Sequence, residues 1–168
     1  MAAGRLSRPF DVAWRENGGN QELYILDGHN NRIRKLVSSD NFASGTLSTL
    51  AGGSWGYQDG PLASAKFALP AGTANEPNVA ETGLSLRDNR LFVTELANQT
   101  VRMIDLNAGT VSTLAGGGWN DRDGLASDAR LLDVSYPYVL PYGPYKGSVL
   151  LSESSNQAVR RINTQWGF

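Results

Sequence analysis

The segment LSTLAGG at Leu47–Gly53 returns as VSTLAGG at Val111–Gly117, 64 residues further along the chain. An aromatic residue and then an Asp-Gly pair follow each copy, namely Trp55 with Asp59-Gly60 and Trp119 with Asp123-Gly124. Alternation of apolar side chains with serine or threonine is typical of a β-strand that is half exposed. Self-similarity at a fixed spacing indicates a protein built from repeated structural units.

A second repeated unit occurs three times, at Leu23–Leu36, Leu91–Ile104 and Val149–Ile162. In each copy a short apolar run ends at an acidic residue, an asparagine stands three positions later, and an apolar residue followed by an arginine comes after it. The acidic residues are Asp27, Glu95 and Glu153; the asparagines are Asn30, Asn98 and Asn156; the arginines are Arg34, Arg102 and Arg160. Agreement at this many positions in three copies establishes the repeat.

Each repeat offers about four strands. The apolar run forms one strand and ends in a turn, in which we expect the asparagine to tolerate the left-handed conformation and to bond its own backbone. The residues around the arginine form the next strand, and the S-T-L-A-G-G segment forms an outer strand. Further strands are expected at Pro9–Trp14 and Pro70–Ala74, because proline is tolerated at the first position of a strand. Four-stranded units arranged radially are the blades of a β-propeller.

The combined pattern of apolar strand, acidic residue, asparagine, arginine, S-T-L-A-G-G and Trp/Asp-Gly loop resembles the NHL repeat. The resemblance runs from about Pro9 to Asn163 and implies an all-β fold of propeller blades, which in this family usually number six. We therefore expect one segment over residues 1–168, with blades at about 9–53 and 70–117 and a partial blade at about 133–163. The third copy departs from the pattern, because Asp133–Tyr145 is rich in proline and tyrosine.

About three blades are too few to close a ring, since closed propellers have roughly four to eight. An open arc would leave apolar blade faces and strand edges exposed. Three arrangements would cover them. The chain is a fragment whose remaining blades lie elsewhere in a longer protein, two chains pair into a six-bladed ring, or copies add head to tail into a filament.

Composition restricts the chemistry that this chain can perform. Of its 168 residues, 40% are hydrophobic and 18% charged, the net charge is −1, and no cysteine is present. Cysteine ligands and nucleophiles are thus absent, and the single histidine, His29, makes histidine triads and multi-histidine metal sites hard to build. We expect no cofactor, no metal and no membrane span. The small number of lysines and the sequon at Asn98 favour an extracellular or cell-surface location.

The repeated polar positions are better explained by structure than by catalysis. A residue present in every blade serves what every blade needs, whereas a catalytic group is needed once. We expect Asp27, Glu95 and Glu153 to close their turns and to pair with Arg34, Arg102 and Arg160 respectively. The Asn positions follow the same argument, although Asn98 also heads the Asn-Gln-Thr glycosylation sequon. If its side chain bonds inward, the sequon should stay unmodified.

Departures from the repeat are the better candidates for binding. The segment from Tyr136 to Tyr145 combines stiff prolines with tyrosines, which bind at low entropic cost, but it could equally be an irregular strand and loop. Trp55 and Trp119 either cover the seams between blades or form a binding rim. His29 is expected to be a solvated turn residue, and Asn75–Gly83 an irregular surface loop. The candidate binding residues are Tyr136, Tyr138, Tyr142, Tyr145, Trp55 and Trp119.

We consider three functions for this sequence. The first is a non-catalytic module that binds another protein or further copies of itself. The second is a hydrolase or lyase of the six-bladed propeller type with a central metal, which would require several histidines or carboxylates at one point. The third is RNA binding, which would require a basic face, whereas the only local clusters are Arg32-Arg34-Lys35 and Arg160-Arg161. We expect the first function and no enzymatic activity.

Overall fold

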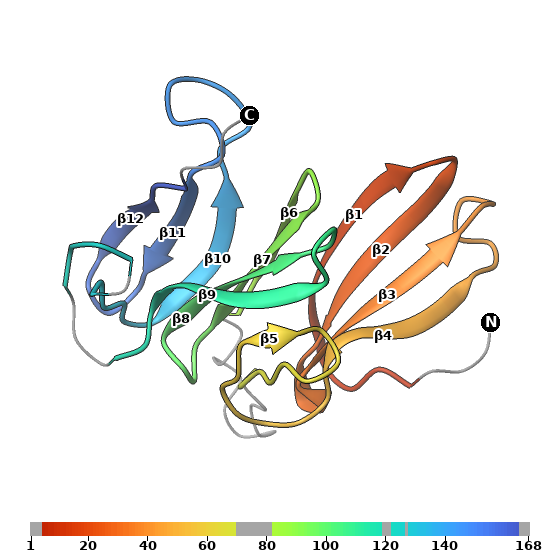
Figure 1. Cartoon of the computed structure of the whole chain (residues 1–168), viewed down its shortest axis with the longest axis horizontal. Helices are drawn as coiled ribbons and strands as arrows, with labels where there is room; N and C mark the ends of the chain where they lie inside the picture. Colours follow the sequence, from red (N-terminus) through yellow and green to blue (C-terminus); the bar gives the residue numbers. More distant parts are fainter. Residues whose placement is uncertain (1–4, 70–81, 119–121, 127, 165–168) are drawn as a thin grey trace.

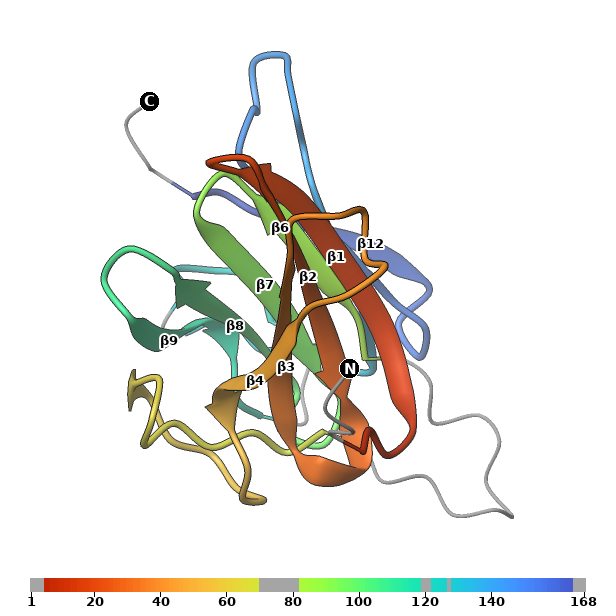
Figure 2. The same ribbon diagram turned by 90° about the vertical axis from the view of Figure 1, so that its right-hand side faces the viewer.

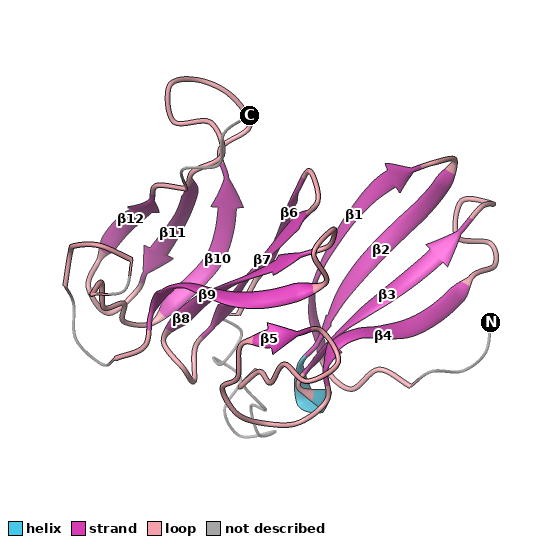
Figure 3. Ribbon diagram, in the orientation of Figure 1, coloured by secondary structure: helices cyan, strands magenta, loops and turns pink. Residues whose placement is uncertain are grey.

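The computed structural model describes residues 5–69, 82–118, 122–126 and 128–164. Within these ranges the chain forms three antiparallel sheets and one short 3₁₀ turn, with no α-helix (Figures 1 and 3). No helix long and apolar enough to cross a membrane occurs in this part of the chain. The prediction of an all-β fold made of antiparallel propeller-type blades is confirmed.

The first sheet, which we call the first blade, is a meander with the strand order β1-β2-β3-β4. Its strands are β1 (Pro9–Asn17), β2 (Asn20–Asp27), β3 (Arg32–Ser38) and β4 (Thr46–Gly52). The turn between β1 and β2 uses Gly18 and Gly19 at φ angles of 59° and 80°, which glycine adopts without strain. The 3₁₀ turn Gly28–Asn30 joins β2 to β3.

The second blade has the strand order β5-β9-β8-β7-β6. Its strands are β5 (Gly60–Pro61), β6 (Leu84–Arg87), β7 (Arg90–Glu95), β8 (Thr100–Asp105) and β9 (Thr110–Gly116). β5 comes from the connector that follows β4, so the outer edge of the second blade is covered by a segment that leaves the first blade. The expected strand at Pro70–Ala74 lies outside the described residues, as does most of Asn75–Gly83.

The third blade contains β10 (Val134–Val139), β11 (Val149–Glu153) and β12 (Ala158–Ile162), in that order. β10 begins where the Tyr/Pro segment begins, so Tyr136-Pro137-Tyr138 is part of an irregular strand whose register with β11 shifts between Ser135 and Tyr138. β12 pairs with β11 alone and presents its other edge unpaired among the described residues.

The three blades lie side by side with their first strands adjacent. β6 contacts both β1 and β10 (Figure 1). In the turned view the first blade lies in front, and strands of the other two blades lie behind it (Figure 2). This is the arrangement of neighbouring blades in an open arc.

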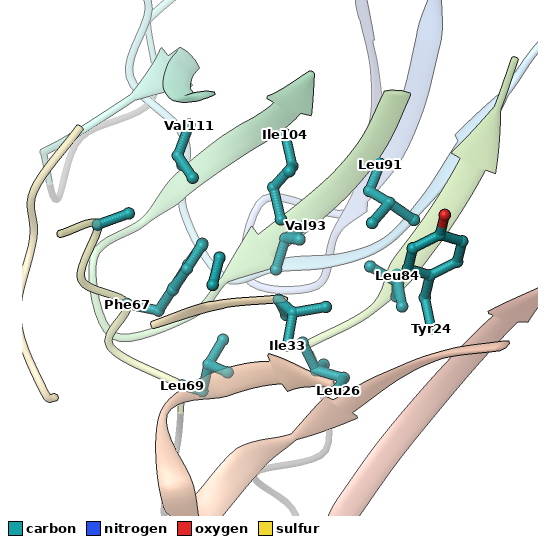
Figure 4. Close-up of a cluster of buried hydrophobic side chains, with 12 residues drawn as sticks. Tyr24, Leu26, Ile33, Phe67, Leu69, Leu84, Leu91, Val93, Ile104 and Val111 are labelled. Atoms are coloured by element: carbon teal, nitrogen blue, oxygen red, sulfur yellow. The ribbon is translucent and has the colours of Figure 1, made fainter. Parts of the chain in front are cut away.

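Apolar side chains fill both seams between the blades. In the first seam, Tyr24, Leu26 and Ile33 of the first blade meet Leu84, Leu91, Val93, Ile104 and Val111 of the second, with Phe67 and Leu69 from the connector (Figure 4). The second seam contains Phe92, Val101, Met103, Val134, Val149 and Leu151. Each such side chain contributes roughly 1.5–3 kcal/mol when it is fully buried.

The middle blade therefore buries both of its faces, whereas each outer blade buries one. In the first blade, Val12 and Trp14 lie on the face opposite the seam, paired with Ile25 and Leu23, and they are 54% and 61% exposed. In the third blade, the corresponding face carries Tyr138 and Val159, which are 57% and 74% exposed. We call these two surfaces the open faces.

A buried ion cluster fastens the first blade to the second. Glu22 accepts hydrogen bonds from Arg15 (2.7 Å), Lys35 (2.6 Å), Tyr24 Oη (2.6 Å) and Asn17 (3.2 Å). Arg15 also donates to the Asp88 carbonyl (2.9 Å) in the turn between β6 and β7. Burial raises the pKa of Glu22, but the hydrogen bonds from Lys35, Tyr24, Arg15 and Asn17 together outweigh it and lower the pKa to about 2.

Replacing Glu22 by glutamine should lower the free energy of unfolding by about 3 kcal/mol at neutral pH, because Arg15 and Lys35 lose their buried counter-charge. Since the folded pKa lies below the unfolded value of 4.5, the stabilisation is present above pH 4.5 and is lost as the pH falls toward 2. Urea unfolding at pH 7 and at pH 2.5 would measure both effects. Glu16→Gln, at an exposed position of β1, is the control; equal effects of the two variants would contradict this account.

Candidate functional site

The repeated acidic residues are buried and hold the segment that leads into each blade. Asp27, Glu95 and Glu153 are 0%, 0% and 1% exposed. Each accepts a hydrogen bond from a backbone amide just upstream: Ser7 to Asp27 at 2.7 Å, Ala68 to Glu95 at 2.8 Å, and Leu132 to Glu153 at 2.8 Å. The carboxylate thus ties the incoming chain to the turn after the second strand of the blade.

The repeated asparagines serve these carboxylates rather than their own backbone. The side-chain nitrogens of Asn30, Asn98 and Asn156 donate to Asp27, Glu95 and Glu153 at 2.9, 3.2 and 3.4 Å. The left-handed conformation belongs to the next residue in each copy, namely Asn31, Gln99 and Gln157, with φ of 48°, 53° and 51°. The expectation about the asparagine backbone was therefore wrong, because a buried carboxylate needs donors and the asparagine side chain supplies one.

Asn98 also donates to the Gly56 carbonyl at 3.4 Å. The nitrogen that would carry a glycan is thus directed inward, toward Glu95 and Gly56. This is the orientation in which we expect the sequon to remain unmodified.

Arg102 joins two blades through two carboxylates. It is 0% exposed and donates to Glu95 of its own turn at 2.7 Å and to Asp59 at 2.6 Å. Asp59 belongs to the Asp-Gly loop that follows the first blade. Arg102 also donates to the Gln58 and Lys66 carbonyls of that connector. All of its hydrogen-bonding groups therefore serve one junction, which a buried cation requires.

Arg160 repeats this junction in the third blade. It lies 2.9 Å from Glu153 and 2.7 Å from Asp123, which belongs to the second Asp-Gly loop. Its Nη2 donates to the Arg122 carbonyl, the position equivalent to Gln58. The predicted pairings of Glu95 with Arg102 and of Glu153 with Arg160 are confirmed.

Arg34 departs from the pattern, and its predicted pairing with Asp27 was wrong. Asp27 instead takes Arg32 at 2.7 Å. Arg32 stands at the position of Thr100 in the second blade, whose hydroxyl donates to Glu95 at 3.0 Å. Arg34 donates to the Ser48 carbonyl at 3.0 Å and makes no ion pair with any described residue. It is 7% exposed, and burial together with nearby Arg32 lowers its pKa, while Asp27 opposes the shift.

The Asp-Gly carboxylate also holds the outer strand of the blade. Asp59 accepts the Thr113 amide at 2.9 Å and the Thr113 hydroxyl at 3.2 Å. Thr49 stands opposite Arg34 as Thr113 stands opposite Arg102, and the strand register shifts at the same point in both blades. Arg34 and Thr49 therefore form a junction that lacks its carboxylate, which we call the Arg34–Thr49 half-site.

The third blade has the carboxylate of the junction, but no described outer strand lies beside it. Beside the unpaired edge of β12 lies a groove of about 660 Å³, which we call the β12 groove. It is lined by Asp123, Gly124, Leu125, Val159, Arg160, Ile162 and their neighbours. In the second blade the same position, between β8 and the Asp-Gly loop, is filled by β9.

The four candidate tyrosines belong to the first strand of the third blade and to the loop that follows it. Tyr136 and Tyr138 are on β10, while Tyr142 and Tyr145 are in the loop between β10 and β11, and all four are more than half exposed. Arg161 stacks on the Tyr145 ring, with its guanidinium carbon 3.7 Å from the ring centre. Tyr138 thus lies on the open face of the third blade, and Tyr145 contacts Arg161 of the same face.

The remaining candidates do not gather with them. Trp55 lies in the connector after the first blade and is 57% exposed, while Trp119 lies outside the described residues. His29 is an exposed residue of the 3₁₀ turn whose backbone amide donates to the Ser7 carbonyl at 3.1 Å. Among the residues that the structure describes, no three His, Cys, Asp or Glu side chains are grouped so that they could hold a metal ion.

Comparisons with known proteins agree with the fold. No family model matches the sequence. The chain is 34% identical over 110 residues to the Arabidopsis thaliana protein named Protein SUPPRESSOR OF QUENCHING 1, chloroplastic, a match that covers 65% of this chain and 9% of that protein.

Two solved structures from Bacteroides thetaiotaomicron superpose on most of the chain. One is a structural-genomics protein of unknown function, with 20% identity and a TM-score of 0.64 over 83% of this chain and 32% of that one. The other is an auxiliary nutrient binding protein, with 17% identity and a TM-score of 0.64 over 90% of this chain and 36% of that one. At such identities the likeness shows a shared propeller-like fold, of which this chain spans about a third of the neighbours' length.

The two arginine positions allow a matched test of the junction. Arg102→Leu should lower the free energy of unfolding by about 3–5 kcal/mol, because Glu95 would keep a buried and uncompensated charge. Arg34→Leu, at the equivalent position without a carboxylate partner, should cost about 1 kcal/mol. Urea unfolding of both variants beside the parent protein measures the difference. Equal losses would show that the Asp59–Arg102–Glu95 junction has no special role.

Proposed function

We propose that the chain is a non-catalytic propeller segment of the NHL type, which binds another polypeptide or further copies of itself through the two ends of its open arc. The observation that carries this proposal is the asymmetry of the ends. The first blade has an arginine and a threonine without the carboxylate that the second blade receives, and the third blade has a carboxylate without the strand that it holds in the second.

The open faces support a binding role through their composition. Leu91, Val93 and Ile104 of the second blade are fully buried against the first blade. Their equivalents in the first blade are Leu23, Ile25 and Leu36, of which Leu23 and Leu36 are partly exposed and Ile25 is buried. They lie on an open face together with Val12 and Trp14, which are more than half exposed. Exposed aromatic and aliphatic side chains on one sheet face are characteristic of protein interfaces.

The comparisons are consistent with a partner of propeller type. The two solved neighbours are each about three times as long as the matched region, so their own chains supply further structure beyond it. One of them is an auxiliary nutrient binding protein, which agrees with a binding role. For this chain, additional blades from a longer polypeptide or from another copy would cover the same open faces.

The basic clusters give little support to RNA binding. Arg32 pairs with Asp27, Lys35 pairs with Glu22, and Arg160 pairs with both Glu153 and Asp123. The charges of these three side chains are compensated within the blades, whereas phosphate recognition needs cations that are free to replace counterions. The other two cluster members make no ion pair with a described residue, but Arg34 is buried and Arg161 stacks on Tyr145.

Light scattering on a sizing column tests the proposal. The protein should have a mass above the 18.1 kDa of one chain, and Trp14→Glu or Val159→Asp should reduce it by placing a charge on an open face. Ala108→Glu is the control, because Ala108 is exposed in the turn between β8 and β9 of the middle blade. Circular dichroism would verify that each variant keeps its sheets. A monodisperse single chain whose mass is the same in all variants would exclude further copies of the chain as the partner.

A further inference from the structure

We propose that Asn17 is a site of spontaneous deamidation, and that the isoaspartate formed there weakens the contact between the first and second blades. The site is the turn between β1 and β2, which lies at the same end of the molecule as the turn between β6 and β7 (Figure 1). The inference is independent of the proposed binding function, because it concerns a chemical change within the chain itself.

The reaction needs only the side-chain amide of Asn17, the backbone nitrogen of Gly18 and water. The Gly18 nitrogen attacks Cγ of Asn17, its proton passes through solvent to the departing amide, and the bond from Cγ to Nδ2 breaks with release of ammonia. Water then opens the cyclic imide at one of its two carbonyls. Opening at the former side-chain carbonyl gives aspartate. Opening at the main-chain carbonyl gives isoaspartate, in which the main chain runs through the β-carbon and is longer by one atom.

The residue after Asn17 makes this attack sterically easy. Asn17-Gly18 is the one Asn-Gly pair in the sequence, and glycine has no Cβ to hinder the approach of its nitrogen to Cγ. All four residues from Asn17 to Asn20 are exposed. A Cβ built on Gly18 or Gly19 would meet no atom within 4 Å. Because two unobstructed glycines form its centre, the turn can change conformation while the strands below it stay paired.

The amide nitrogen that would attack is available at Asn17 and engaged at other asparagines. The Gly18 amide donates no hydrogen bond to any atom in the described part of the chain. The next amide is a hydrogen-bond donor after five other asparagines, namely Asn30, Asn41, Asn98, Asn107 and Asn156. Such a bond holds the nitrogen in place and away from the preceding side chain. The structure therefore favours Asn17 over these sites.

One hydrogen bond restrains the Asn17 side chain. Its Nδ2 donates to Glu22 at 3.2 Å, which is the longest of the four contacts that this carboxylate accepts. A distance of this length is at the upper end of the normal range for such bonds. Glu22 keeps three shorter contacts when this one opens, so the Asn17 amide can leave the cluster and react.

Isoaspartate would disturb the pairing that positions Arg15. In the hairpin, Asn17 stands opposite Asn20 and Arg15 stands opposite Glu22. From this position Arg15 donates to the Asp88 carbonyl of the second blade at 2.9 Å. An additional main-chain atom at position 17 breaks the match between the two strands next to the turn, because the register of a hairpin depends on the length of its turn. The modification also removes one donor from Glu22, so it loosens the point at which the first blade is tied to the second.

Mass spectrometry of the full-length protein, incubated at mildly alkaline pH and then digested with trypsin, tests the first part of the proposal. Trypsin releases residues 16–32 as one peptide, in which Asn20, Asn30 and Asn31 are internal comparisons for Asn17. Conversion of amide to acid should be at least about tenfold faster at Asn17 than at the other three, because glycine follows Asn17 alone. Asn17→Gln should stop the fast conversion, since the longer side chain must close a larger ring. Equal rates at the four asparagines would overturn the proposal.

Urea unfolding tests the second part. Ion exchange separates the modified protein from the unmodified one by its additional negative charge, and Asn17→Asp is the reference that carries the charge without the additional main-chain atom. The modified fraction should unfold at a lower urea concentration than this reference. Treatment with an isoaspartyl methyltransferase, which returns isoaspartate to aspartate, should restore the stability of the reference. A modified fraction as stable as Asn17→Asp before the treatment would overturn this part.

NMR locates the effect. Arg15 also donates to the side chain of Asn89 at 2.6 Å, so the Asn89 amide reports on the contact between the two blades. This amide should shift in the modified fraction relative to Asn17→Asp, and the amide of Asn107, in a turn at the outer side of the second blade, should not. Shifts confined to the first blade would show that the modification leaves the contact between the blades intact, which would contradict the inference.

Discussion

The buried guanidinium of Arg102, held between Glu95 and Asp59, is the interaction on which the arrangement of the blades depends. Glu95 closes the turn of the second blade and holds the incoming chain through the Ala68 amide. Asp59 arrives from the connector of the first blade and also holds the outer strand through Thr113. A cation buried this deeply is tolerated only when its partners are all present, so one side chain ties together three segments that are far apart in sequence.

The strands could be predicted from the sequence because their signal is local. Alternating apolar and polar residues reveal a sheet with one buried face, and a 64-residue offset between two S-T-L-A-G-G segments reveals repeated units. The two seams follow from the same pattern. Leu91 and Val93 are turned toward one neighbour and Phe92 toward the other, as a period of two demands.

The junctions could not be predicted because their partners are distant. Arg102 and Asp59 are separated by 43 residues, and nothing local indicates that the Asp-Gly loop of one blade reaches the arginine of the next. The sequence does contain a usable signal, since the arginine occurs three times and the loop with a tryptophan and an Asp-Gly pair only twice. The pairing of Asp27 with Arg32 goes with a departure from the repeat, because the first blade has arginine where the other two have threonine and alanine.

The function that we propose rests on what the repeat leaves incomplete. A residue present in all three blades supports the fold, but a junction completed in two blades and left open in the first marks a place where another chain segment belongs. The same logic applies to the edge of β12 and to the apolar open faces. These features favour an assembling or binding module, whose partner contributes a strand, a carboxylate-bearing loop or a whole blade.

Native-state amide hydrogen exchange of Thr113 and Thr49, measured in one dilute sample of single chains, tests the central claim most directly. The two threonines occupy the same register position, and they differ in that Asp59 accepts the Thr113 amide while no described carboxylate meets Thr49. The account predicts strong protection at Thr113 and rapid exchange at Thr49. Equal protection at both positions would contradict it, because the junction would then contribute nothing that the unfinished blade lacks.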